Sequence, residues 1–312
     1  MKHVYKYLLM LALALSLCVL WGCGEKAPAP GQPDDTQQQP DTGDTQTEQP
    51  AALSDVIECC DGDITLRFIR TEDGTWAWKD DRDFPLDNTY AQHLLRSVEE
   101  MLAAQPITTD KSMEDLGLDE EEKYVTASDE TGKTVTWYLG KKDDAGRYYM
   151  RRADDETNAV YLSPADLSAQ ISRSIYDMML LPQLNSIPIE SIHSVVIERG
   201  EQRLEMRPSS QGVLTGGTAD VQPLLDLLAQ PTLSRCVDYR PSKGAAAICG
   251  LDPAEAVLTV EYVNNLQAES IFTLSIGSKR NDSYCVCVND DTTIYLMNAA
   301  AVEAVLAFVP QE

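Results

Sequence analysis

The sequence predicts an α+β protein built from two tandem repeated modules, each an antiparallel β-sheet with two helices. Three observations support this fold class. Short segments alternate between apolar and polar residues, which is typical of half-buried strands. Gly and Asp turn signals separate these segments. Landmark residues recur in the same order in both halves of the chain, after a polar N-terminal stretch that cannot fold.

The first 22 residues have the layout of a secretory signal, with lysines ahead of an uncharged apolar run from Leu8 to Leu20. The run is shorter than the about 20 apolar residues that a membrane-spanning helix needs. It ends in Leu20-Trp21-Gly22-Cys23, which resembles the lipobox of bacterial lipoproteins, although Trp21 departs from the small residue usual there. We expect cleavage before Cys23 and lipid on its thiol. An ordinary cleaved signal or an uncleaved anchor is the alternative.

Residues 23–53 change abruptly to Pro, Gln, Thr and Asp with almost no apolar content. Such a segment cannot bury enough surface to offset its chain entropy, and we predict a disordered tether. A flexible coil of this length spans roughly 30 Å. The tether would hold the folded part on the extracytoplasmic face of the cell membrane, joined to it through the lipid.

The formal net charge is −25, and the acidic residues are spread along the chain. This charge argues against nucleic acid, whose phosphates require Lys and Arg, and against electrostatic binding to anionic lipid. The acidic groups lack the spacing of a calcium-binding loop. We therefore interpret them as a solvated surface and predict neither a metal site nor a cofactor.

The cysteines after Cys23 suit buried thiols or disulfides, because export permits disulfides. A zinc site at Cys285 and Cys287 would need further ligands, and none stands at a suitable spacing. The pair Cys236 and Cys249 is the best candidate for a disulfide. The thiols concerned are Cys59, Cys60, Cys236, Cys249, Cys285 and Cys287.

The repeat predicts a first module at 54–173, an apolar connector at 174–188 that packs against both modules, and a second module at 189–312. Each copy reads as a hairpin, an amphipathic helix, a Gly-Leu-Asp loop, alternating strands and a short closing helix. The paired landmarks are Leu66 with Leu204, Gly74 with Gly212, Gly117-Leu118-Asp119 with Gly250-Leu251-Asp252, Leu139-Gly140 with Ile276-Gly277, Tyr148 with Tyr284, and Val160 to Leu162 with Ile294 to Leu296.

The predicted elements follow the same order in both copies. They are hairpins from Val56 to Ile69 and from Ser194 to Met206, helices around Leu94 to Leu102 and from Val221 to Leu228, strands from Thr134 to Leu139, Tyr148 to Arg152, Val257 to Val263, Ser270 to Ile276 and Tyr284 to Val288, and closing helices from Pro164 to Ile171 and Ala299 to Phe308.

The two Gly-Leu-Asp loops could mark a site, but we interpret them as structural turns. Gly117 and Gly250 would supply a positive φ, Leu118 and Leu251 would insert into the core, and Asp119 and Asp252 would bond nearby backbone. Likewise, the paired acids at 154–155 and 290–291 suit hairpin turns.

Two tryptophans align with leucines in the other copy of the repeat. Trp137 and Trp76 align with Leu274 and Leu214, so we expect both to be buried. Trp78 has no such counterpart, and it suits either packing or a sugar-stacking surface. Without a Gly-x-Ser-x-Gly elbow, a His-Glu-x-x-His pair or a phosphate loop, we predict no enzymatic activity.

The motif Gly250-Leu251-Asp252-Pro253, the strand end at Gly277 and the strand at Tyr284 resemble a bacterial lipoprotein family known as domain of unknown function 4340. The resemblance covers roughly residues 54 to 309, although Glu120 replaces the Pro after Asp119. Members are commonly encoded beside membrane parts of ABC-type transport systems. The resemblance therefore implies an accessory role with a membrane-protein partner, and it supplies no catalytic residues.

Three functional hypotheses remain. The first is a non-enzymatic, lipid-anchored interaction module for a membrane transport complex. The second is a lipoprotein that binds a solute or glycan between its modules, which a cleft with convergent polar groups would favour. The third is an envelope hydrolase that uses acidic residues.

Overall fold

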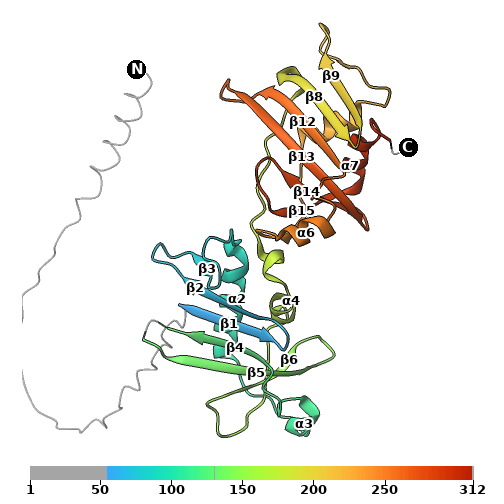
Figure 1. The fold of residues 1–312 in the computed structure, drawn as a ribbon. Coiled ribbons are helices and arrows are strands. Elements are labelled where there is room, and N and C mark those ends of the chain that lie inside the picture. The colour runs from blue at the N-terminus through green and yellow to red at the C-terminus, as the bar shows by residue number, and fades with distance from the viewer. Residues whose placement is uncertain (1–54, 130, 311–312) are drawn as a thin grey trace, which may run out of the picture. The chain divides into compact units, whose positions relative to one another are not determined.

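The computed structural model describes residues 55–129 and 131–310, and these form an α+β fold with two antiparallel sheets (Figure 1). The expected α+β class is therefore confirmed. Cys23, the signal segment and the tether lie outside the described residues. Within the described part, no helix is both long and apolar enough to span a bilayer.

The first sheet has seven strands, and every pairing in it is antiparallel. Its spatial order is β3 (Trp76–Trp78), β2 (Thr65–Arg70), β1 (Val56–Asp61), β4 (Lys123–Ser128), β5 (Thr134–Lys142), β6 (Tyr148–Arg152) and β7 (Tyr161–Leu162).

The second sheet has eight strands, also antiparallel. Its order is β10 (Leu214–Thr215), β9 (Gln202–Pro208), β8 (Ile192–Arg199), β12 (Ala256–Val263), β13 (Glu269–Arg280), β14 (Ser283–Val288), β15 (Ile294–Asn298) and β11 (Arg235–Asp238). Strands β8, β9, β10, β12, β13, β14 and β15, taken in chain order, occupy the same places in the second sheet as β1 to β7 do in the first. Strand β11 adds one strand at the edge, beside β15.

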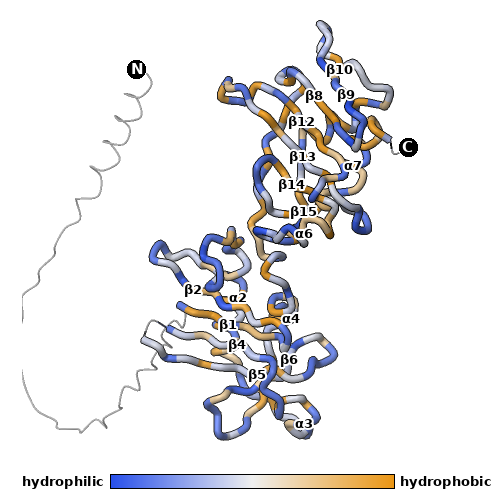
Figure 2. Tube along the Cα trace, in the orientation of Figure 1, coloured by the Kyte–Doolittle hydropathy of each residue, from blue (hydrophilic) through white to orange (hydrophobic). Residues whose placement is uncertain are grey.

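Alternation decides which face of each strand is buried. In the β1–β2 hairpin, Ile57 lies opposite Phe68 and Cys59 opposite Leu66, and all four side chains are buried. The residues between them point to the other face because successive side chains alternate. Figure 2 shows the result as hydrophobic stretches within the strands and hydrophilic residues at the hairpin turns.

The helices that bury main-core residues cover the buried face of each sheet. Helix α2 begins after Asp87, whose side chain accepts a hydrogen bond from Thr89 N at 2.9 Å, and it buries Ala91, Leu94 and Val98 at helical spacing. The helices are α2 (Asn88–Ala103), α3 (Met113–Leu116), α4 (Leu167–Ile171), α5 (Gln222–Ala229), α6 (Lys243–Ile248) and α7 (Ala299–Leu306), with 3₁₀ turns η1 (Ile175–Met178) and η2 (Ile189–Ser191).

The expectation of two helices per sheet needs correction, because a third short helix precedes each Gly-Leu-Asp loop. Helix α3 is held by a capping box between Ser112 and Asp115, and α6 is capped by Ser242. Helices of one or two turns are too short to show a 3.6-residue hydrophobic period. Only their capping residues could have indicated them.

The tryptophans predicted to be buried are buried: Trp137 on β5 is 2% exposed, and Trp76 on β3 is 5% exposed. Trp78 is half-buried and packs edge-to-face against Phe84, with ring centroids 5.5 Å apart. Trp137 and Trp76 therefore pack in the core, and Trp78 packs against Phe84 with part of its surface exposed.

The apolar connector at 174–188 is packed rather than exposed. Met179 is buried and forms an isolated bridge with Leu86, just before α2. Ile187 is also buried, and its N–H donates to the carbonyl of Leu228 at the end of α5. The connector thus contacts elements that belong to both halves of the chain.

Candidate functional site

The Gly-Leu-Asp loops take a similar backbone form in both halves. Gly117 ends α3 with φ +66°, and Gly250 follows α6 with φ +68°, a left-handed conformation that suits glycine. Leu118 is buried, and Leu251 is half-buried against a second small cluster. Asp252 precedes Pro253 through a cis peptide bond.

Each loop is pressed against a glycine in the neighbouring strand. A β-carbon on Gly140 of β5 would lie 2.2 Å from the carbonyl oxygen of Leu116, and one on Gly277 of β13 would lie 2.1 Å from that of Cys249. Both glycines stand at register irregularities, between Leu139 and Lys142 in β5 and at the corresponding place in β13. The strand-end glycines and the Gly-Leu-Asp loops therefore form one structural unit, which repeats.

Behind each loop lies a small hydrophobic cluster on the face of the sheet opposite the main core. In the first sheet, Leu116, Leu118 and Val160 make this cluster. In the second sheet, its buried members are Cys249, Cys285 and Ile294. Each loop therefore follows a short helix and packs, through this cluster, on the last strands of its sheet.

The acid pairs also serve turns. Asp155 accepts hydrogen bonds from Thr157 N and from the hydroxyl of Tyr161, and Asp291 does the same for Thr293 N at 2.9 Å and the hydroxyl of Tyr295 at 2.7 Å. These hydrogen bonds lower the pKa of Asp155, those from Thr157 having the largest effect. These two carboxylates are therefore engaged in hydrogen bonds within their own hairpins.

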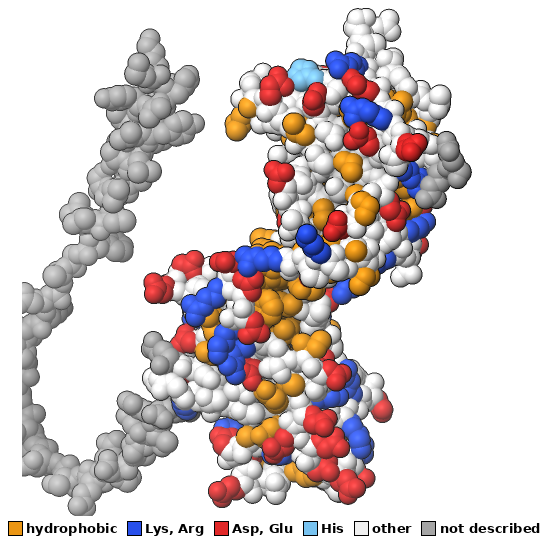
Figure 3. All heavy atoms as spheres, in the orientation of Figure 1, with side chains coloured by type: hydrophobic (Ala, Val, Ile, Leu, Met, Phe, Trp, Pro, Cys, Tyr) orange, Lys and Arg blue, Asp and Glu red, His pale blue; other side chains and the backbone are white. Residues whose placement is uncertain are grey.

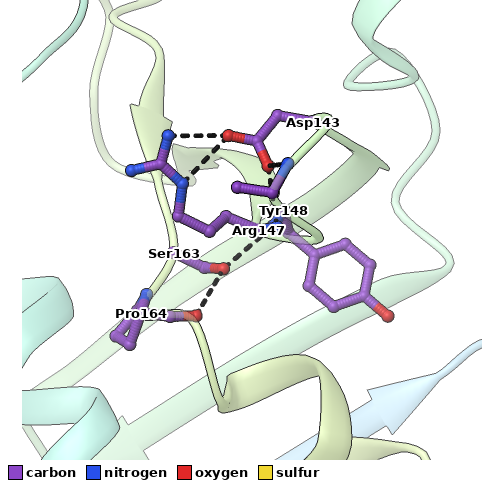
Figure 4. A network of polar contacts seen from close by, with 6 residues as sticks. Asp143, Arg147, Tyr148, Ser163 and Pro164 are labelled. Atoms are coloured by element: carbon purple, nitrogen blue, oxygen red, sulfur yellow. Dashed lines mark hydrogen bonds and ion pairs between the residues drawn. The ribbon is translucent and has the colours of Figure 1, made fainter.

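A comparable turn joins β5 to β6 (Figure 4). The carboxylate of Asp143 accepts two hydrogen bonds from the Arg147 guanidinium, at 2.9 and 2.7 Å, and another from the Arg147 backbone N–H. Next to it, Tyr148 N donates to Ser163 Oγ at 2.9 Å, which links β6 to the end of β7. The backbone hydrogen bond from Arg147 is the main reason why the pKa of Asp143 is lowered.

The face of the first sheet opposite the main core is open beyond the small cluster, and this open face carries a row of tyrosines and arginines. Tyr138 on β5 lies beside Arg151 on β6, whose guanidinium carbon is 4.5 Å from the centre of the tyrosine ring. Arg151 also donates to the carbonyl of Leu118 at 2.8 Å and to Glu121 at 2.8 Å. In Figure 3, basic, acidic and hydrophobic side chains are interspersed over the side of the molecule that carries β1, β4 and β5.

The row continues to the far strands through Tyr124 on β4. Its hydroxyl donates to Glu58 Oε1 on β1 at 2.7 Å, and Glu58 also pairs with Arg67 on β2. That hydrogen bond, ahead of burial, raises the pKa of Tyr124. Each side chain is therefore held by its neighbours, so the face presents aromatic and charged groups in fixed positions.

Two hollows lined by described residues have volumes that could hold a small ligand. One, of about 370 Å³, lies beside the first Gly-Leu-Asp loop, and Asp119 is among its acidic lining residues with Glu120 and Glu122. The other, of about 350 Å³, is lined by α2, the connector and β11. There Arg173 donates to the hydroxyl of Tyr90, and Arg235 pairs with Asp177 at 2.7 Å.

The expected disulfide between Cys236 and Cys249 does not form. Both thiols are free and buried, Cys236 in the main core and Cys249 in the small cluster behind the second loop. The thiol that Cys249 meets is that of Cys285, which hydrogen-bonds to it. Spacing along the chain could not reveal this, because the meeting depends on α6 folding over β14.

No group of three or more His, Cys, Asp or Glu side chains suited to a metal ion occurs among the described residues. Cys23, the expected lipid attachment site, lies outside them.

Comparison with known proteins yields one family match. No curated protein and no solved structure matches the chain. The matched region contains Gly117-Leu118-Asp119 and Gly140, but it ends before Gly250, Gly277 and Tyr284, so it is narrower than the resemblance inferred from the sequence. Residues 76–220 match the family described as Domain of unknown function (DUF4340).

Proposed function

We propose that this chain is a non-enzymatic interaction module, held outside the cytoplasm by lipid on Cys23, that docks onto a protein of a membrane transport complex. The observation that carries the proposal is the row of Tyr124, Tyr138 and Arg151 on the open face of the first sheet. Tyrosine and arginine are enriched in protein–protein interfaces and among the residues that contribute most to binding.

The geometry of the row favours a protein partner. Because the side chains already hold one another, binding would immobilise few additional rotamers, and this lowers the entropic cost of association. Arg151 is one-fifth exposed and Arg67 about two-fifths exposed, so both keep surface for a partner. An acidic or carbonyl-rich surface on the partner would complement them.

The proposal includes a duplication that produced the two sheets. Their strands follow the same path, and the glycines at 140 and 277 meet the same loop in each. On this interpretation the row is specific to the first copy. Tyr138 pairs with Arg151 in the first sheet, and at the equivalent places in the second sheet Ser275 pairs with Cys287. One copy would then bind, and the other would mainly support it.

Affinity purification of the tagged full chain from gently solubilised membranes tests this proposal. We expect membrane-complex subunits to co-purify with the natural chain. Tyr138→Ala combined with Arg151→Ala should lower their recovery by roughly tenfold or more, because important interface residues contribute about 2 kcal/mol each. Thr273→Ala, on the open face of the second sheet, is the matched control, and Cys23→Ala tests the anchor.

Unchanged recovery with the double variant, once its melting temperature is shown to be normal, would refute docking through this face. Normal membrane association of Cys23→Ala would refute the lipid anchor separately.

A second candidate is binding of a solute or glycan in the hollow of about 350 Å³. The observation that favours it is the convergence of Tyr90, Tyr176, Arg173 and Asp177 on one cavity, since a few convergent polar groups with aromatic walls are typical of ligand sites. Calorimetry with sugars and small acids, repeated with Arg173→Ala, would test it. Binding that survives this substitution would place the ligand elsewhere.

A further inference from the structure

The second sheet gathers three cysteines where the first sheet has none. At the equivalent places in the first sheet stand Leu116, just before Gly117, and Tyr149 and Arg151 on β6. In the second they are Cys249, Cys285 and Cys287, all members or neighbours of the small cluster behind the loop. Ordinary packing does not require sulfur at these positions, because the first sheet fills them with other side chains.

The three thiols come together from two elements. Cys249 follows α6, and its carbonyl accepts the backbone hydrogen bond of Ser278 at 2.8 Å, which fixes it against β13. Cys285 and Cys287 lie two residues apart on β14, on the sheet face that α6 covers. Cys249 and Cys285 are buried members of the same small cluster, and hydrogen bonding between the two thiols contributes to the raised pKa of Cys285.

We propose that Cys249 and Cys285 are an oxidisable pair that forms a disulfide between the loop after α6 and strand β14. The inference goes beyond the proposed interaction function, and of that proposal it rests only on the location outside the cytoplasm. In an extracytoplasmic compartment, where disulfides persist, the bond would fasten the second Gly-Leu-Asp loop to the sheet.

A disulfide-bearing oxidant would accomplish this by thiol–disulfide exchange. Cys287 is half-buried, whereas Cys249 and Cys285 are 3% and 0% exposed, so Cys287 meets the oxidant first. Its sulfur attacks the oxidant and releases one reduced thiol. Cys249 then attacks the Cys287 sulfur and releases the other half of the oxidant as a second reduced thiol. Finally, Cys285 attacks the Cys249 sulfur and displaces Cys287, which returns to the thiol form. Two protein thiols are oxidised and one oxidant disulfide is reduced to two thiols.

The surroundings assign roles to the sulfurs. Arg280 Nη2 donates to Cys249 Sγ at 3.2 Å and places a positive charge beside the sulfur that attacks Cys287. Burial, followed by the hydrogen bond with Cys249, raises the pKa of Cys285 to about 12. Cys285 is also 0% exposed, so it enters last, when the exchange has become intramolecular.

The test uses the reduced full chain and oxidised glutathione as the probe. After incubation, remaining thiols are counted under denaturing conditions, and the linked peptides are identified by mass spectrometry without reduction. We expect a loss of two thiols per chain and a peptide that joins Cys249 to Cys285. Cys236→Ser is the matched control and should behave as the natural chain does.

The variants separate the roles. Cys249→Ala and Cys285→Ala should abolish this linkage, whereas Cys287→Ser should slow its formation severalfold without preventing it. Melting temperatures of the reduced variants identify any that do not fold. A linkage of Cys236 to Cys249, of Cys249 to Cys287 as the final product, or no loss of thiols in the folded natural chain would overturn the proposal.

Discussion

The carbonyl oxygen of Cys249 lies against the α-carbon of Gly277, so closely that a β-carbon there would stand 2.1 Å away. The same relation joins Leu116 and Gly140 in the first sheet. In each case a helix end and a strand irregularity fit together only because the strand residue has no side chain. This contact explains why two motifs far apart in the sequence recur as a pair.

Replacing Gly277 with alanine should therefore destabilise the protein, by roughly 1–3 kcal/mol or more, because the backbone has to shift to admit the methyl group. Gly244→Ala within α6 is the matched control, since its nearest neighbour would be the Ser242 hydroxyl at 3.8 Å and alanine favours helices. Urea unfolding measures both. Equal midpoints for the two variants would contradict the close contact.

The small cluster behind the first loop can be tested through Leu118, which is 1% exposed. Leu118→Ala should lower the free energy of unfolding by about 2–5 kcal/mol, because it removes buried methyl groups and leaves a cavity. Leu266→Ala, at a position 87% exposed, should change stability by less than about 0.5 kcal/mol. A small effect at Leu118 would mean that the loop does not anchor there.

The carboxyl group of Asp73, in the turn between β2 and β3, should titrate at unusually low pH. Hydrogen bonds from Thr71 and Thr75 lower the pKa of Asp73 to about 2. Since an unfolded Asp has a pKa of about 3.9, the carboxylate stabilises the fold above that pH, and this contribution is lost as the pH falls from about 4 towards 2.

Carbon-13 NMR of the Asp73 carboxyl should give this low midpoint, and the Thr71→Ala, Thr75→Ala double variant should move it upwards. An Asp73 that titrates near 4 in the natural chain would refute the turn geometry.

Thiol reactivity should follow burial. Burial, as the largest effect, raises the pKa of Cys59 to about 12, and the side chain is 2% exposed. Burial also raises the pKa of Cys287 to about 11, but its side chain is half-buried rather than enclosed. Iodoacetamide at pH 8 should therefore label Cys287 well before Cys59 in the folded chain, as followed by peptide mass spectrometry. Similar rates at both sites would show that β1 opens readily.

Several features could be predicted from neighbouring residues alone. Alternation identified the hairpins around Gly62 and Gly200, and helical spacing identified α2 and α5. Comparison of the halves assigned Trp137 to the core because leucine stands at the corresponding place. All of these signals can be found in one sequence, because they come from neighbouring residues or from comparison of the two halves.

Other features were missed for identifiable reasons. Helices α3 and α6 are too short for a periodic signal, and β11 consists of only four residues at a sheet edge. The predicted Cys236–Cys249 disulfide is wrong because separation along the chain does not say which face of the sheet a thiol occupies. Cys236 joins the main core, and Cys249 joins the opposite face.

The sequence by itself thus determined the fold class, the turn positions and the buried face of each strand, because alternation and turn chemistry act between residues only a few positions apart. The tertiary structure alone decided that Cys249 meets Cys285, that Tyr138 meets Arg151 and that Gly277 receives the end of α6. These contacts depend on strand order and on which face a short helix covers. Both are settled by long-range packing, to which no local pattern responds.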